Sequence, residues 1–324
     1  MAEQKSNAAV SRDEALKRQS NISLIRSLLP VIGLVVVFII FNILTKGGML
    51  QNLSMVMTQI YVTMIAATGV FFIMTMGGLD FSQGSILGMA SIVVCMVSKV
   101  APVPVAVLAG IATGAGIGAI NGFFYVNRKI KSFIVTICTM FLFRGIIKYL
   151  TSDAPVGANA MMILLNKDQL KLICTLAVVV VGFVAFHFTK FGIHLRAIGA
   201  GEKAAKFAGI HTDRTKFLIY LLAGAITGFA AFINVIKVGS VTASGGNQLE
   251  TQILIALVLG GMPISGGAKA RFMNVIVGSL LYIVLTSGLI MMGLTTQAMQ
   301  LIQGVVFLVF VAIFADRESL KVIK

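Results

Sequence analysis

Apolar residues along this chain run in long blocks that are separated by short polar segments. A helix of about 20 residues crosses a hydrocarbon core that is about 30 Å thick. The blocks predict about ten transmembrane helices, at residues 28–45, 55–76, 84–100, 102–126, 133–150, 170–189, 216–238, 250–261, 272–292 and 297–314. The third and eighth blocks are short for a full crossing. We therefore expect an all-α membrane protein, a polytopic bundle with broken or short helices.

The composition excludes most soluble classes of protein. Of the 324 residues, 58% are hydrophobic and 11% are charged, whereas soluble domains carry about 25% charged residues. The net charge of +15 does not indicate a nucleic-acid-binding protein, because the cations lie between apolar blocks and not on one polar face. Cys95, Cys138 and Cys174 lack metal-ligand spacing. We expect them to be packing residues, and we expect no metal or cofactor in this chain.

The distribution of Lys and Arg predicts the orientation of the chain in the membrane. If the N-terminus is cytoplasmic, 19 of the 26 basic residues lie in cytoplasmic segments, six lie at the outer side and Arg144 lies within a helix. Such an excess of cations is typical of the cytoplasmic side. We therefore expect a cytoplasmic segment at 1–27, one transmembrane domain at 28–314 with an uncleaved first helix, and a cytoplasmic tail at 315–324.

The fourth block carries a face of small residues. Gly110, Gly114, Gly118 and Gly122 recur at every fourth position and so line one side of a helix. Small faces let helices approach closely in lipid. The pattern favours tight packing inside the bundle over a pore wall, and by itself it does not distinguish packing within one chain from dimerisation.

A glycine-rich segment interrupts the apolar pattern between the second and third blocks. It contains Gly77, Gly78, Asp80, Ser82 and Gly84, which make a continuous helix through this point unfavourable. Irregular backbone at membrane depth persists only where it is buried in protein or lines a cavity. An acidic residue at such a place is a functional candidate. The alternative interpretation is that Asp80 caps the next helix, and both roles are compatible.

A second glycine-rich segment follows the eighth block and contains Gly260, Gly261 and Ser265. Both segments have the pattern G-G-x-x-x-S-x-G, which is typical either of related broken helices in two halves of a repeat or of coincidence in a glycine-rich chain. Glu250, at the start of the eighth block, is the second acidic residue close to an apolar block. We count it with the candidate site residues for this reason.

A long charged stretch at about 190–215 separates the sixth and seventh blocks. Glu202, Ala204, Ala205 and their neighbours favour a short helix outside the membrane, and Gly209 is placed to end it. A direct connection needs far fewer residues. We interpret the stretch as a coupling helix whose small side chains enter a groove of a partner protein. The alternative is a solvated basic loop.

Four segments, in order along the chain, resemble the ribose-type ABC importer permeases. Residues 77–84 are similar to that family's G-G-[IL]-D-[LF]-S-x-G segment. Residues 133–136 with Thr139, Met140, Arg144 and Gly145 resemble the family's next marker. Its cytoplasmic coupling segment is matched by Phe191, Gly192, 197–199 and 202–210. Its late glycine-rich segment is matched by Leu249, Glu250, Gly260, Gly261 and 265–267. The likeness covers about residues 55–314. Gly201, Gln83 and Thr251 depart from the family pattern, which bears on the solute and not on the machinery.

The resemblance implies a permease subunit of a binding-protein-dependent importer in the bacterial inner membrane. The solute would be a ribose-like pentose, a hexose or a similar small polar molecule. A cytoplasmic ATP-binding subunit would dock near Gly199 and residues 202–209 and would bind the ATP, so that this chain is not itself an enzyme. An extracytoplasmic binding protein would deliver the solute. The permease would work as a homodimer or with a close paralogue, surrounded by lipid.

A secondary transporter or channel is the alternative function. That class needs a coupling-ion site or a charged relay inside the membrane, for which this chain offers only Asp80, Arg144 and Glu250. A secondary transporter or channel would also have no partner subunit to dock on the charged stretch at 190–215. A membrane enzyme needs converging acid, base or nucleophilic groups, and the three histidines show no metal-binding spacing.

Overall fold

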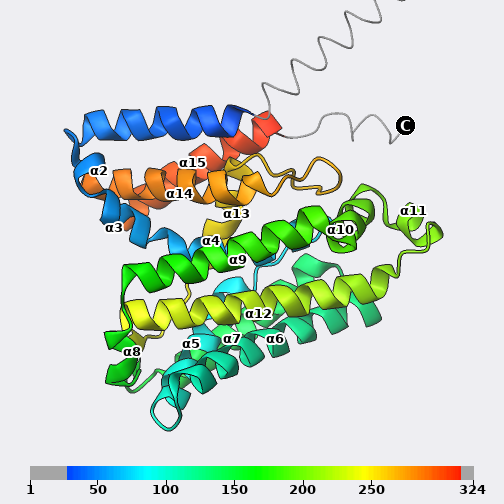
Figure 1. Ribbon diagram of the computed structural model, residues 1–324, viewed down its shortest axis with the longest axis horizontal. Coiled ribbons are helices and arrows are strands. Elements are labelled where there is room, and N and C mark those ends of the chain that lie inside the picture. Colours follow the sequence, from blue (N-terminus) through cyan, green and yellow to red (C-terminus); the bar gives the residue numbers. More distant parts are fainter. Residues whose placement is uncertain (1–27, 315–324) are drawn as a thin grey trace, which may run out of the picture.

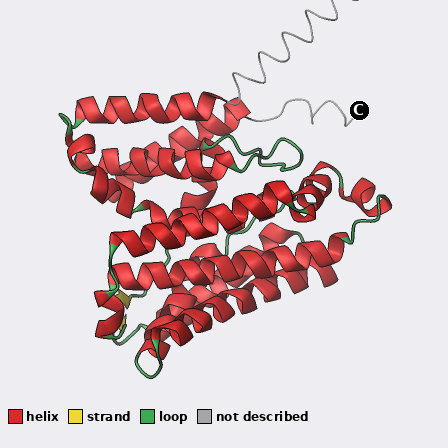
Figure 2. Ribbon diagram, in the orientation of Figure 1, coloured by secondary structure: helices red, strands yellow, loops and turns green. Residues whose placement is uncertain are grey.

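The computed structural model describes residues 28–314, and the predicted segments 1–27 and 315–324 lie outside the described residues. After a first helix at Leu28–Leu44, the helices are α2 Gly48–Gln51, α3 Leu53–Thr58, α4 Ile60–Thr75, α5 Gln83–Ser98, α6 Val103–Asn127, α7 Ser132–Leu150, α8 Ala160–Leu164, α9 Asp168–Phe188, α10 Lys190–Ala200, α11 Glu202–Phe207, α12 Thr212–Val238, α13 Leu249–Leu259, α14 Met273–Met291 and α15 Thr296–Phe314. Two short strands, β1 Val156–Gly157 and β2 Ser240–Val241, pair antiparallel. Figure 2 shows how completely helices dominate the described part of the chain.

Within residues 28–314, six helices are long and apolar enough to cross a membrane, at Leu53–Thr75, Val103–Asn127, Ser132–Leu150, Asp168–Phe188, Thr212–Val238 and Met273–Met291. Four shorter apolar helices occupy the other predicted blocks, at Leu28–Leu44, Gln83–Ser98, Leu249–Leu259 and Thr296–Ala312. Every predicted block therefore contains a helix, and the expectation of a polytopic, all-α membrane protein is confirmed. The count of about ten crossings remains a prediction, because it depends on the four shorter helices.

α4 is the central helix of the bundle. All of its residues except Val62 are buried, as expected for a helix that is apolar on every side. Phe71 packs edge-to-face against Phe186 of α9 and against Phe272, which precedes α14, with ring centroids 4.9 and 5.4 Å apart. In Figure 1, α5, α6, α7 and α12 gather on one side of α4, and the first helix, α14 and α15 lie on the other. α4 therefore joins the two groups.

The glycine face of α6 packs against α12 within the same chain. A Cβ at Gly114 would lie 2.9 Å from Cα of Gly228 and would collide with the carbonyl oxygen of Gly224. A Cβ at Gly110 would lie 3.1 Å from the carbonyl oxygen of Gly228, and Gly118 approaches the backbone of Tyr220. Two helix backbones can approach this closely only because both faces lack side chains. The pattern thus serves internal packing, the first of the two interpretations that the sequence left open.

Replacing Gly114 by Ala should destabilise the protein, because the added methyl group meets backbone atoms that cannot rotate away. Overpacking of this kind costs roughly 1–3 kcal/mol. Gly116 is the matched control, since it lies on the same helix and a Cβ there meets nothing within 4 Å. Thermal unfolding of the detergent-purified variants should show a clear loss for Gly114→Ala and none for Gly116→Ala. Equal behaviour of the two variants would contradict the assigned interface.

Candidate functional site

α4 ends at the first glycine-rich segment, as the sequence predicted. Gly77 adopts a left-handed conformation with φ of +83°, which glycine reaches without steric cost. The amides of Gly77 and Gly78 donate to the carbonyls of Met74 and Ile73, at 2.9 and 3.0 Å. This is the Schellman pattern, which satisfies the last carbonyls of a helix. The interruption is therefore a fully bonded helix end.

Between α4 and α5 the backbone is irregular, and α7 supplies hydrogen-bond acceptors for it. The amide of Leu79 donates to Oγ of Ser132, and the amide of Phe81 donates to Oγ1 of Thr136, each at 3.2 Å. Ser132 and Thr136 lie one turn apart on α7, so their spacing along the helix matches that of alternate residues on the extended segment. The backbone amides of Leu79 and Phe81, which lie outside both helices, thus have partners inside the bundle, as low-dielectric surroundings favour.

Asp80 lies at the turn into α5 and is only 1% exposed. Its Oδ1 accepts hydrogen bonds from the amide and the hydroxyl of Ser82, at 2.7 and 2.6 Å, and its Oδ2 accepts one from Nε2 of Gln83 at 2.7 Å. Three donors therefore surround this carboxylate and hold it at the start of the helix. These contacts favour the capping interpretation of Asp80 over direct contact with a ligand.

The hydrogen bonds continue from Ser82 and Gln83 into three further helices. Asn121 of α6 donates to Oγ of Ser82 at 2.8 Å and accepts from Oγ1 of Thr139 of α7 at 2.7 Å. The hydroxyl of Thr227 of α12 donates to Oε1 of Gln83. Sequence reasoning missed Asn121 and Thr227 as part of the site. An amide within an apolar helix was the available signal, because such a group needs a polar partner.

Glu250 and Gly84, two residues predicted for the site, lie against each other. Glu250 is in the first turn of α13 and Gly84 is in the first turn of α5. A Cβ at Gly84 would collide with the Glu250 carboxylate and with the carbonyl of Gly246. The positive ends of two helix dipoles therefore approach one carboxylate. Gly84 is required here because only hydrogen fits between the two helix starts.

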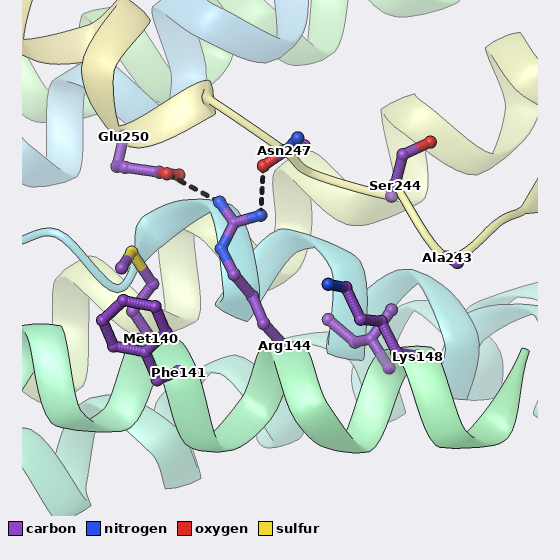
Figure 3. Close-up of a pocket in the computed structure, with 10 residues that line it drawn as sticks. Met140, Phe141, Arg144, Lys148, Ala243, Ser244, Asn247 and Glu250 are labelled. Carbon is purple, nitrogen blue, oxygen red and sulfur yellow. Dashed lines mark hydrogen bonds and ion pairs between the residues drawn. The ribbon is translucent and has the colours of Figure 1, made fainter.

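Arg144 forms an ion pair with Glu250 where the first turns of α5 and α13 meet. Nη2 of Arg144 on α7 lies 2.6 Å from Oε1 of Glu250, and Nη1 of Arg144 donates to Oδ1 of Asn247. Figure 3 shows the guanidinium reaching from α7 between these two acceptors. The side chains of Arg144 and Glu250 are 19% and 9% exposed, so this charge pair is held largely away from solvent. It links α7 to the start of α13.

A cavity of about 470 Å³ opens beside the ion pair. Its lining comes from α7, from the loop between β2 and α13 (residues 242–248) and from the first turn of α13; it consists of Met140, Phe141, Arg144, Ile147, Lys148, Ala243, Ser244, Gly245, Asn247 and Glu250. Figure 3 places Met140 and Phe141 on the α7 wall, opposite the loop. The cavity therefore combines charged and amide groups with an apolar wall.

The second glycine-rich segment ends α13 in the same way that Gly77 ends α4. Gly261 has φ of +85°, and the amides of Gly261 and Met262 donate to the carbonyls of Val258 and Leu257. The structural equivalent of Gly77 is thus Gly261, although the repeated letters align Gly77 with Gly260. The shared G-G-x-x-x-S-x-G pattern therefore reflects two similar helix ends, but the equivalent glycines differ by one position in the sequence alignment.

The two glycine-rich segments touch each other and the end of α10. The amide of Gly267 donates to the carbonyl of Thr75 at 2.8 Å, and a Cβ at Gly77 would lie 3.3 Å from the carbonyl oxygen of Ser265. Gly199 of α10 is packed so closely that a Cβ would collide with that same Thr75 carbonyl and lie 2.9 Å from Cα of Gly267. Residues from three predicted segments therefore form one junction without intervening side chains.

α11 forms where the sequence predicted a short charged helix, and Gly209 ends it with φ of +83°. Glu202 forms an ion pair with Lys216 of α12, which fixes the helix to the bundle. Ala205 is 4% exposed and is packed within the chain, so the expectation that its side chain enters a partner's groove needs correction. Phe207, by contrast, is 93% exposed. The accessible part of α11 includes Ala204 and Phe207.

Removing the Asp80 carboxylate should destabilise the bundle according to how many donors lose their acceptor. Asp80→Asn keeps one oxygen for Ser82 and should cost about 1 kcal/mol, whereas Asp80→Ala strands three buried donors and should cost roughly 3 kcal/mol or more. Thermal unfolding of purified protein measures both losses. The exposed Asp153 serves as control, and Asp153→Asn should change nothing. If Asp80→Ala were as stable as the unmodified protein, the capping role would be wrong.

Comparisons with known proteins identify the family. Residues 52–311 match the model of the family described as branched-chain amino acid transport system, permease component. The chain is 32% identical to the ribose import permease of Bacillus subtilis, over 90% of this chain and 92% of that protein. It is 30% identical to the galactose/methyl galactoside import permease of Escherichia coli K12, over 84% and 87%. No solved structure matches. This chain therefore belongs to the branched-chain amino acid transport system permease family, in which it is similar to import permeases for sugars.

Proposed function

We propose that this chain is the membrane-spanning subunit of an ATP-driven importer for a monosaccharide or a similar small polar solute. The similarity to ribose and galactose permeases carries the proposal, because it extends over more than four fifths of each chain. The polar groups of Asp80, Asn121, Arg144 and Glu250 inside an apolar bundle support it, since such groups are retained in membranes chiefly at functional places.

The solute path is proposed to run past the two interrupted segments. α5 and α13 are shorter than the six long apolar helices, and their first turns meet at Glu250. Discontinuous helices whose ends meet near the middle of the membrane form binding sites in many transporters. Gly77, Gly78, Asp80 and Ser82 shape the path at one end of α5, and Gly260, Gly261 and Ser265 do so at the end of α13. Asp80 positions the backbone and does not itself select the solute.

ATP-driven uptake tests this function. The permease, its ATP-binding subunit and its binding protein would be reconstituted in liposomes and supplied with labelled D-ribose, D-xylose or D-galactose. We expect accumulation of at least one sugar, with strict dependence on ATP and on the binding protein. Uptake that needs an ion gradient and proceeds without ATP would instead favour a secondary transporter.

The ATP-binding subunit is proposed to dock on the accessible face of α11. Phe207 offers an exposed aromatic side chain of the type that anchors protein interfaces. The junction of Gly199, Thr75 and Gly267 then connects the docking helix to both glycine-rich segments through direct backbone contact. Movement of the ATP-binding subunit would reach the solute path by this route. This chain binds no ATP itself in the proposed mechanism.

The remaining partners follow from the same assignment. An extracytoplasmic binding protein delivers the solute at the opposite end of the bundle, and a second permease copy or a close paralogue completes the path. Apolar side chains that are exposed on α7 and α9, such as Leu142 and Val181, face lipid or that second copy. The assembly lies in the bacterial cell membrane, and nucleic acid has no part in it.

Replacing Phe207 by Ala should weaken binding of the ATP-binding subunit about tenfold or more, because a buried interface aromatic typically contributes at least about 1.4 kcal/mol. Phe123→Ala is the control, since Phe123 is also exposed but lies on α6. Co-purification and ATP-dependent uptake are the measurements. Ala205→Arg is unsuitable for this purpose, because Ala205 is buried and the change should reduce the amount of folded protein. Full association of Phe207→Ala would exclude this docking face.

The proposed topology has ten crossings with both termini in the cytoplasm. It places Lys203, on α11, in the cytoplasm and Lys167, before α9, outside. In a chain without Cys95, Cys138 and Cys174, the variants Lys203→Cys and Lys167→Cys should react with a membrane-impermeant thiol reagent from opposite sides. Intact cells and inverted vesicles separate the two sides. The proposed topology has one crossing, α9, between these two positions. Labelling of both positions from one side would contradict it, because that result requires an even number of crossings between them.

A further inference from the structure

We propose that the cavity beside the Arg144–Glu250 ion pair binds the sugar during its passage, as a transient site inside the permease. This inference rests on the proposed function and specifies where, within the path, the solute is contacted. The ligand class is an uncharged monosaccharide whose hydroxyl groups bind Arg144, Asn247 and Glu250. The apolar wall of Met140 and Phe141 contacts its carbon–hydrogen face.

The size of the cavity fits such a ligand. Its volume is about 470 Å³, and sites for small molecules typically measure about 300–1,000 Å³. The cavity is partly open, so a solute can enter and leave. A site along a transport path must bind firmly enough to admit the solute and weakly enough to release it. Enclosure on two sides, by α7 and by the loop 242–248, meets both needs.

The polar groups of the lining retain unused hydrogen-bonding capacity. A guanidinium has five donors, of which Arg144 uses one toward Glu250 and one toward Asn247. Within residues 28–314, no hydrogen bond from Nδ2 of Asn247 and no partner of the Lys148 ammonium is found. Sugar hydroxyls both donate and accept, so one ring can bond to these donors and to the carboxylate of Glu250. An apolar solute would leave them unpaired, at an energetic cost.

The charge of the lining also restricts the ligand. Arg144 and Glu250 neutralise each other, and Lys148 leaves one positive charge at the mouth of the cavity. A cationic solute is therefore disfavoured by like-charge repulsion. The paired arrangement also lets a neutral polyol compete for both members of the ion pair at once, since a hydroxyl group can replace either partner. Solute contact at Arg144 thus coincides with contact at the start of α13.

Labelling of Ser244 tests occupancy of the cavity by the sugar. Ser244 is exposed and lines the cavity, and the variant Ser244→Cys would be made in the chain without native cysteines. The complete importer in liposomes would be treated with a thiol reagent in the presence of the binding protein, with and without D-ribose or whichever tested sugar is imported. We expect the sugar to slow labelling about tenfold while the complex turns over ATP.

The control position is Ser152, which is exposed just beyond α7 and outside the cavity lining. Labelling of Ser152→Cys should not depend on sugar. Protection of Ser244→Cys by sugar-free binding protein alone would mean that docking covers the loop, and would overturn the site. Uptake with no sugar-dependent protection would overturn the site while leaving the proposed function intact. Absence of uptake by the unmodified importer would instead refute the function.

A double substitution separates solute binding from a purely structural ion pair. Arg144→Gln with Glu250→Gln keeps two side chains of hydrogen-bonding character and leaves no unpaired charge. If the pair only holds α7 to α13, the double variant should fold and import sugar at nearly the normal rate. If the pair binds solute, the double variant should fold and assemble with the ATP-binding subunit, but uptake should fall about tenfold or more, with a changed ratio between D-ribose and D-galactose. Normal uptake with an unchanged ratio would refute the inference.

Discussion

The need of backbone amides for hydrogen-bond partners in an apolar bundle governs the segment between α4 and α5. α4 stops before it meets α5, and the residues between the two helices would be costly in an apolar medium without partners. Ser132 and Thr136 on α7 accept their amide protons, and Asp80 accepts those of Ser82. The positions of α6, α7 and α12 around this segment follow from that requirement. The polar groups of the candidate site are consequently part of what holds the bundle together.

The helix ends were predictable from the sequence because they depend on local chemistry. Gly77 and Gly209 end helices at the expected places, since a left-handed residue after a helical run favours glycine. Which small residue of α11 remains accessible was not predictable, because Ala204 and Ala205 are the same residue type and only packing within the chain distinguishes them. The meeting of Gly84 with Glu250 depends on tertiary contacts for which the sequence carries no local pattern.

Family resemblance and geometry account for different parts of the site. The motifs that resemble sugar permeases include Arg144 and Glu250 separately, but their ion pair arises only when α7 and the start of α13 come together. Asn121 belongs to none of these motifs and yet connects Ser82 to Thr139. A residue that supports a motif from a neighbouring helix has no reason to lie near that motif in the sequence, which is why such residues are found from the structure.

The backbone contact between α6 and α12 limits how the protein can change shape. Helices that meet through side chains can slide as those side chains change rotamer, but Gly114 and Gly228 leave nothing to rotate. The two helices therefore move as one rigid body. α12 has 27 residues and so a length of about 40 Å, with α11 tied to one end by Glu202 and β2 following the other. A displacement of α11 would therefore tilt α6 and α12 together and would reach the loop that carries Asn247.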